Sequence, residues 1–191
     1  MKPLHIVLPF VVCLFLVACD SSKDKIKRNI EEMSSAPISV PFDNMKCWTN
    51  DSIKEVSPWK HAKIKLVHYI DSANCTSCYL TKIMNVEYLF QKEKESNNDF
   101  YNIFIVDPRS NKSSLYRLKT QHDNNEIPST IFIDSCHMFI DTNIKIPKEN
   151  MYHIFLLDEN NNVIFVGNPL ANEEMKEKIF RIINERLKQN K

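Results

Sequence analysis

Glycine is almost missing from this chain. Its 191 residues include one glycine, Gly167, against 20 asparagines. A chain with so little glycine needs another residue for turns with a positive φ angle, and asparagine tolerates the left-handed region better than most residues that carry a side chain. We therefore expect asparagine at the tight turns, most clearly at Asn160-Asn161-Asn162 and Asn124-Asn125.

An excess of charge is also missing. The chain carries 25 basic and 24 acidic side chains, so the composition gives no sign of the basic surface that binds phosphate backbones. We expect no nucleic-acid partner. The sequence shows no internal repeat, which argues against a solenoid, and its length suits one domain with its own core.

A long apolar run occurs at the N-terminus. It extends from Ile6 to Val17 behind Lys2, which is too short to span a bilayer comfortably and typical of a signal peptide. It ends at Ala18-Cys19, the small residue and thiol that a lipobox requires, since lipid is attached to the thiol and the peptidase cleaves before it. An uncleaved anchor or a buried helix is disfavoured, because residues 20–28 are too polar to pack.

The sequence therefore predicts a signal peptide over residues 1–18 and a diacylglyceryl lipid on Cys19. The protein is expected in the cell envelope, outside the cytoplasm and anchored to a membrane through this lipid. Residues 19–36 form the lipidated N-terminus and a polar linker, which is expected to be helical between Lys23 and Met33. Residues 37–59 are an irregular entry segment with an extended piece near Ile38–Val40.

Residues 60–191 alternate between strand and helix patterns. The predicted strands cover 62–70, 101–106, 129–133, 152–157 and 163–166, and the predicted helices cover 76–95, 110–121 and 172–188. The polar segment 158–162 is a hairpin signal. This order gives parallel strands joined by helical crossovers and an antiparallel pair on the same sheet. We predict an α/β domain with three layers.

Four cysteines remain after Cys13 is removed and Cys19 is lipidated, and two of them form a CxxC pair. Cys75 and Cys78 lie between the first predicted strand and the first predicted helix. Backbone N–H groups and the dipole at a helix N-terminus stabilise a thiolate, so Cys75 is predicted to be the nucleophile. Cys78, one turn further, would attack the mixed disulfide. A structural disulfide or half of a zinc site are the alternatives.

Around this motif the chain resembles the membrane-tethered thioredoxin-like proteins of bacterial envelopes, the TlpA/ResA and peroxiredoxin-related superfamily. The resemblance covers about residues 60–190. Leu66–Ile70 is similar to the strand that leads into the active-site loop, 127–134 to a short extended segment, and 154–163 to the terminal hairpin. The ending 166–170 is similar to that of thioredoxin-like lipoproteins from Bacteroidetes-type bacteria.

The resemblance implies a thioredoxin-like fold with a mixed sheet flanked by helices. It also implies a thiol–disulfide oxidoreductase that acts on protein thiols or disulfides in the envelope; we expect no cofactor. Two positions depart from the family: Asn74 replaces an aromatic residue before the first cysteine, and Met151-Tyr152 replaces a cis-proline at the start of the hairpin. A cis bond without proline costs about 2.5–4 kcal/mol, so we expect a trans bond there.

Two histidines are candidates for proton transfer. His68 falls near the buried acid or amide that assists proton transfer in related proteins, so it is predicted to accept the proton of Cys78. The alternative is a core histidine bonded to the backbone. His153 follows Tyr152 and is a second histidine that could face the thiols.

Two rival hypotheses use the same cysteines. Cys75, Cys78 and either Cys136 or His153 could hold zinc or copper(I), as in a protein similar in fold to Sco-type copper chaperones. In the second rival hypothesis, the domain is not catalytic and its disulfide only stabilises the loop. Two states are expected for Cys47 and Cys136. They either pair with each other or are both buried as small apolar residues.

Overall fold

The computed structural model describes residues 22–48, 58–71, 76–108, 112–124 and 130–188. The predicted signal peptide, Cys19 and Cys75 lie outside the described residues. Among the helices that are described, none combines the length and the apolar composition needed to cross a membrane.

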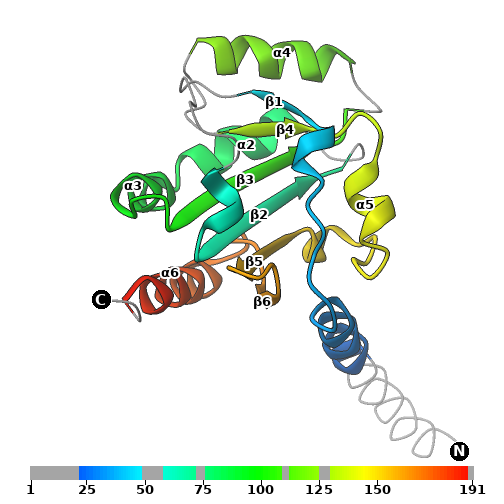
Figure 1. Cartoon of the computed structure of the whole chain (residues 1–191), viewed down its shortest axis with the longest axis vertical. Coiled ribbons are helices and arrows are strands. Elements are labelled where there is room, and N and C mark those ends of the chain that lie inside the picture. Colours follow the sequence, from blue (N-terminus) through cyan, green and yellow to red (C-terminus); the bar gives the residue numbers. More distant parts are fainter. Residues whose placement is uncertain (1–21, 49–57, 72–75, 109–111, 125–129, 189–191) are drawn as a thin grey trace, which may run out of the picture.

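Strands and helices alternate along most of the chain (Figure 1). The strands are β1 (Lys46–Trp48), β2 (Ile64–Ile70), β3 (Phe100–Val106), β4 (Ile131–Ile133), β5 (Ile154–Asp158) and β6 (Val163–Val166). The helices are α2 (Thr76–Met84), α3 (Glu87–Glu95), α4 (Lys112–Asp123), α5 (Met138–Thr142) and α6 (Glu173–Lys188), with 3-10 turns η1 (Phe42–Asn44), η2 (Pro58–His61) and η3 (Asn150–Tyr152). An N-terminal helix covers 22–33.

The six strands form one sheet in the order β1-β4-β3-β2-β5-β6. β2, β3 and β4 are parallel to one another, whereas β5 is antiparallel to β2 and β6 is antiparallel to β5. Helical crossovers join the parallel strands, and a hairpin followed by α6 closes the chain. The predicted fold class is thus confirmed: a thioredoxin-like α/β arrangement with a mixed sheet flanked by helices.

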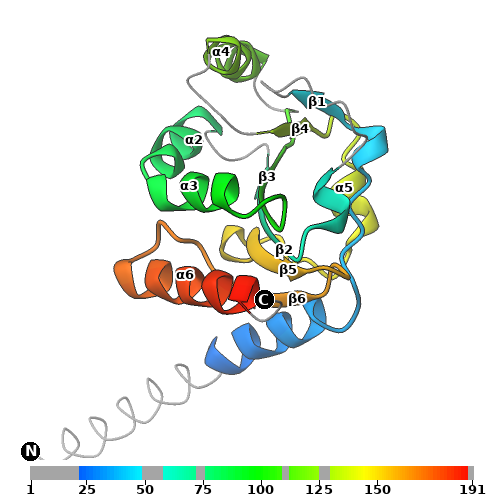
Figure 2. The same ribbon diagram turned by 60° about the vertical axis from the view of Figure 1, so that its left-hand side comes forward.

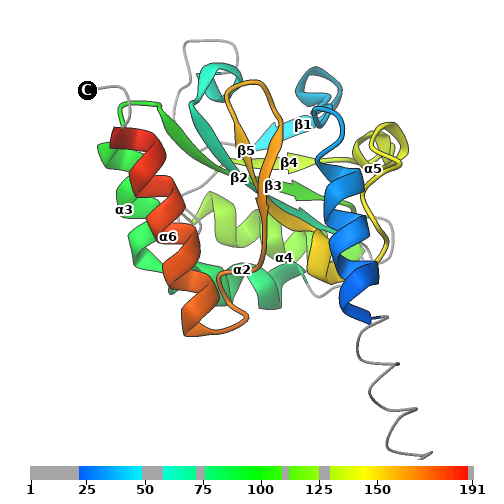
Figure 3. The same ribbon diagram turned by 90° about the horizontal axis from the view of Figure 1, so that it is seen from below.

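The sheet separates two hydrophobic clusters, one on each face. β2 is buried along its whole length, and its residues alternate between the clusters: Leu66 and Ile70 belong to one, Val67 and Tyr69 to the other. α3 and α6 cover the first face, and α5 and the N-terminal helix lie on the opposite side (Figures 2 and 3). A central strand buried on both faces explains the nearly continuous apolar run in this part of the sequence.

The single helix predicted over 76–95 is wrong, because two helices are present. α2 ends at Met84 and α3 begins at Glu87. In one continuous helix Leu89 would lie about 180° around the axis from Leu80, at roughly 100° per residue. Both side chains are fully buried, and the break at residues 85–86 turns α3 so that both face the core.

The expectation that asparagine occupies positive-φ turns is borne out in part. Among the described residues with a positive φ, Asn97, Asn98 and Asn161 are asparagines and the other is His137. Asn124 has no positive φ, and Asn125 lies outside the described residues. Gly167 has no positive φ; a Cβ there would lie 2.4 Å from the sulfur of Met175, so a larger residue would have to displace the Met175 side chain of α6.

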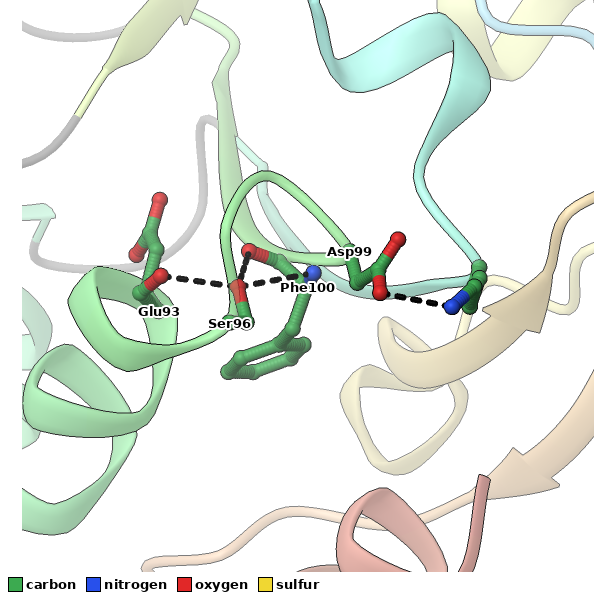
Figure 4. Close-up of polar contacts among 5 residues, drawn as sticks. Glu93, Ser96, Asp99 and Phe100 are labelled. Carbon is green, nitrogen blue, oxygen red and sulfur yellow. Dashed lines mark hydrogen bonds and ion pairs between the residues drawn. The ribbon is translucent and has the colours of Figure 1, made fainter. Parts of the chain in front are cut away.

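The turn between α3 and β3 is closed by polar contacts of Ser96 and Asp99 (Figure 4). The Ser96 hydroxyl donates to the carbonyl of Glu93 at 2.8 Å and accepts from the Phe100 N–H at 3.1 Å. Asp99, in the same turn, pairs with Lys63 at 2.7 Å. These contacts fix the start of β3 relative to β2.

The N-terminal segment contains the predicted helix, and its end packs against the domain. Met33 is fully buried, Asn29 donates to the Tyr152 hydroxyl at 3.0 Å, and Lys25 pairs with Glu149 at 3.0 Å. The extended piece predicted at 38–40 is not a strand. The segment instead contributes η1 and the short outermost strand β1, which pairs with β4.

Candidate functional site

The three parallel strands each end at an aspartate. Asp71, Asp107 and Asp134 directly follow β2, β3 and β4, and the register pairs Ile70 with Val106 and Val106 with Ile133. Because neighbouring strands lie about 4.8 Å apart, the aspartates form a row at the carboxyl ends of these strands. Asp107 and Asp134 are almost fully buried.

Cys78 lies close to this row, at the start of α2. It is the third residue of the helix, its side chain is exposed, and it is disulfide-bonded. No acidic residue lies in the first turn of α2, so the positive end of the helix dipole is not offset there by a carboxylate. Cys75 itself lies outside the described residues.

Cys78 opens onto a cavity of about 390 Å³ between α2 and the start of β5. Its polar lining comes from Cys78, Tyr79, Lys82, Asn150, His153 and Asn168. A space of this size holds a small ligand or several water molecules. The cavity therefore brings the redox cysteine and one of the two candidate histidines together.

His68 lies behind this cavity and does not line it. Its ring is fully buried, stacks on Phe104 with centroids 4.5 Å apart, and has Nδ1 2.7 Å from the Tyr79 hydroxyl. Burial lowers the pKa of His68 to about 3, against a smaller opposing effect of the Asn102 side chain. His68 is thus a neutral ring that reaches the cavity only through Tyr79, and its role in proton transfer stays a prediction.

His153 is held at the wall of the cavity by contacts on both sides. Its Nε2 lies 3.0 Å from the Pro147 carbonyl, its ring meets Tyr69 edge-on at 5.1 Å, and its Nδ1 is 3.7 Å from Asp71 Oδ2. Burial lowers the pKa of His153, and the Pro147 carbonyl and the charges of Asp71 and Glu149 oppose this shift only in part. His153 is therefore a neutral base beside the redox cysteine.

Tyr152, which precedes it, stands where the resemblance drawn from the sequence places a cis-proline. Among the described residues there is no cis peptide bond, so the trans bond expected at Met151-Tyr152 is confirmed. The segment forms the 3-10 turn η3, and the Tyr69 N–H donates to the His153 carbonyl at 2.9 Å. This backbone contact places His153 next to the end of β2.

The predictions for Cys47 and Cys136 are wrong, because both are free and exposed. Cys47 lies in β1, the outermost strand, opposite Phe132 of β4. Cys136 lies in the turn that follows β4, in which the His137 N–H reaches the Asp134 carbonyl. One cysteine is on an edge strand and the other beyond the end of the neighbouring strand, so each side chain faces solvent.

A second histidine–aspartate pair is formed by His137, the residue that follows Cys136, and Asp107. His137 Nδ1 lies 3.1 Å from Asp107 Oδ2. The Asp134 carboxylate accepts the N–H groups of Met138 and Phe139 at 3.0 and 2.8 Å, which are the first two of α5. This carboxylate therefore uses the free N–H groups at the start of that helix.

Asp71, Tyr79 and Lys82 were not among the residues predicted from the sequence. Asp71 carried a signal, because it follows a buried strand directly and precedes the CxxC pair. Tyr79 and Lys82 carried none, since their direction depends on how α2 packs on the sheet. Within the described ranges, no group of three or more histidine, cysteine or acidic side chains is arranged to hold a metal ion.

No family model matches the sequence, and no curated protein sequence is significantly similar to it. Solved structures of similar fold include an uncharacterized thioredoxin-like protein from Porphyromonas gingivalis, with 16% identity, coverage of 82% of this chain and 97% of the other, and a TM-score of 0.49. The thioredoxin domain of a thiol-disulfide oxidoreductase from Bacteroides vulgatus has 15% identity, coverage of 79% and 100%, and a TM-score of 0.46.

An exposed lipoprotein thioredoxin from Streptococcus pneumoniae is also similar, with 14% identity, coverage of 68% of this chain and 88% of the other, and a TM-score of 0.45. These structural neighbours are thioredoxin-like proteins. At such identities the similarity concerns the arrangement of strands and helices, and it assigns no activity to this chain.

Proposed function

We propose that this protein is a lipid-anchored thiol–disulfide oxidoreductase of the cell envelope that acts on protein thiols or disulfides. The observation that carries the proposal is the position of Cys78: an exposed, disulfide-bonded cysteine in the first turn of a helix, on a cavity at the end of a central strand. A disulfide that only staples a loop needs neither the exposure nor the cavity.

The chemistry follows from the two positions of the CxxC pair. The thiolate of Cys75 attacks a substrate disulfide and forms a mixed disulfide, which Cys78 then resolves. A thiolate near a helix N-terminus is stabilised by N–H groups and by the dipole, which raises the fraction of reactive anion at neutral pH. The exposure of Cys78 supports exchange with a protein substrate, because it places the disulfide that Cys78 forms at the surface, where a partner can approach it.

Anchoring rests on the lipobox at Cys19. Replacement of this residue by serine removes the thiol that carries the lipid, so Cys19→Ser should abolish incorporation of labelled fatty acid and leave the signal peptide uncleaved. Cys13→Ser, in the apolar run, is the matched control and should be labelled and cleaved like the wild type. A Cys19→Ser protein that still incorporates the fatty acid would contradict the anchoring proposal.

The redox proposal is tested by exchange with insulin or glutathione disulfide. The purified protein should reduce insulin disulfides, and Cys75→Ser or Cys78→Ser should abolish turnover. Cys47→Ser and Cys136→Ser remove exposed free thiols elsewhere and should keep wild-type turnover. Absence of turnover in the wild-type protein, together with loss of stability on reduction, would overturn the proposal in favour of a structural disulfide.

A further inference from the structure

His153 is a buried base in which one of the two ring nitrogens makes a hydrogen bond and the other makes none with the described residues. Its side chain is almost completely buried, and its Nε2 lies 3.0 Å from the carbonyl oxygen of Pro147. A carbonyl can only accept, so Nε2 carries the ring proton. The neutral ring therefore presents a lone pair at Nδ1, which makes no hydrogen bond with the described residues.

The groups around Nδ1 of His153 would stabilise a proton that this nitrogen accepts during thiol–disulfide exchange. The Asp71 carboxylate oxygen lies 3.7 Å away and would form an ion pair with the protonated ring. The charged and titratable groups that face the ring or share its cavity are Cys78, Tyr79 and Lys82 of α2, Tyr69 and Asp71 at the end of β2, and Glu149 before η3. Glu149 pairs with Lys25 at 3.0 Å, whereas Asp71 places a carboxylate oxygen within 4 Å of the ring.

We propose that His153 Nδ1 accepts the thiol proton of Cys78 when Cys78 resolves the mixed disulfide, and that Asp71 positions and stabilises the protonated ring. The inference rests on the proposed oxidoreductase function. His153 and Cys78 line the same cavity, which gives the proton a path between them. His68 does not line this cavity, and its Nδ1 lies 2.7 Å from the Tyr79 hydroxyl.

The step balances without a cofactor. The proton of Cys78 moves to His153, and the resulting thiolate attacks the Cys75 sulfur of the mixed disulfide. A bond forms between the two protein sulfurs, and the bond between Cys75 and the substrate sulfur breaks. The substrate sulfur leaves with the electron pair and takes the proton from His153, so the substrate disulfide is reduced and the CxxC pair is oxidised.

The test separates the two chemical steps in the reaction of reduced protein with glutathione disulfide, followed by acid quenching and mass spectrometry from pH 5 to pH 9. His153→Gln keeps an amide N–H for the Pro147 carbonyl and removes the base. Formation of the mixed disulfide should keep its wild-type rate, whereas resolution at pH 7 should slow about 100-fold. Raising the pH to 9 should restore most of this rate, because Cys78 then ionises unaided.

His122→Gln is the matched control, since His122 is also buried but lies on α4 away from the cavity; it should resolve at the wild-type rate. Asp71→Asn leaves the ring in place and should slow resolution less than His153→Gln, so it decides the question if the latter does not fold. Wild-type resolution and pH dependence in both variants would overturn the inference. A wild-type protein that forms no mixed disulfide would instead overturn the proposed function.

Discussion

Two corners of this molecule place a cysteine, a histidine and an aspartate at the carboxyl ends of the parallel strands. In the Cys78 corner, Asp71 and His153 accompany a cysteine that is disulfide-bonded. In the Cys136 corner, Asp107 and His137 accompany a free cysteine. The side-chain types are the same, so the difference between the corners comes from the backbone around each sulfur.

The two cysteines differ in the helix that follows the strand. Cys78 belongs to α2, a helix of 9 residues with no acidic side chain in its first turn. Cys136 precedes α5, a helix of 5 residues. The first two N–H groups of α5 already donate to the Asp134 carboxylate. A short helix whose N–H groups are occupied by a carboxylate offers little to a thiolate. The composition of a corner therefore does not by itself make it a redox site.

The largest expected effect is the loss of unfolding free energy in acid that the buried histidines on the Cys78 side of the molecule cause. The unfolded chain binds a proton on His68 near pH 6.5, whereas burial holds the folded pKa at about 3. Between these values the unfolded state holds more protons, so the unfolding free energy falls as the pH drops below 6.5, by about 1.4 kcal/mol per pH unit for one histidine. The lowered pKa of His153 acts in the same direction. Urea unfolding from pH 7 to pH 4 measures this slope.

His68→Gln should reduce that slope by about one proton, because the side chain that must stay neutral behind Tyr79 is gone. His61→Gln is the control, since His61 is exposed and has similar surroundings in the folded and unfolded chain. The slope, and not the absolute stability, decides the outcome. Equal slopes in wild type and His68→Gln would contradict the account of the Cys78 corner.

A smaller effect is expected from freeing the N–H groups of the Cys136 corner. Asp134→Ala removes the carboxylate that accepts the N–H groups of Met138 and Phe139, and should lower the unfolding free energy by about 2 kcal/mol. The same change should speed alkylation of Cys136 by iodoacetamide at neutral pH. Glu177→Ala, which removes an exposed acid on α6, outside this corner, should change neither. Unaltered alkylation of Cys136 in a folded Asp134→Ala protein would show that the carboxylate is not what separates the corners.

Much of the fold could be predicted because its signals are local. β2 and β3 are buried on both faces and give apolar runs that only Lys65, His68 and Asn102 interrupt with a buried polar side chain. The hairpin is closed by Asp158, whose carboxylate accepts the N–H groups of Asn160 and Asn162. By contrast, β1 has three residues, too few for a periodic pattern, and the break between α2 and α3 reflects the need to bury Leu89.

The candidate site was predictable only in part. The CxxC motif placed Cys78 at a helix start from spacing alone. Which histidine reaches the cavity depends on the antiparallel register of β2 and β5, in which His68 pairs with Ile154. This register brings His153 to the end of β2 beside Asp71. No pattern within one segment encodes such a pairing, so both histidines were candidates until the sheet was assembled.

The N-terminal helix limits how far the domain can lie from the proposed lipid on Cys19. Lys25 and Asn29 fasten this helix to Glu149 and Tyr152, beside the cavity. With the proposed lipid on Cys19, only three Cα–Cα steps, about 11 Å of extended chain, lead to the start of the helix at residue 22. Under that proposal, so short a connection would hold the cavity near the bilayer surface, where it would meet the sulfur atoms of proteins that lie close to the membrane.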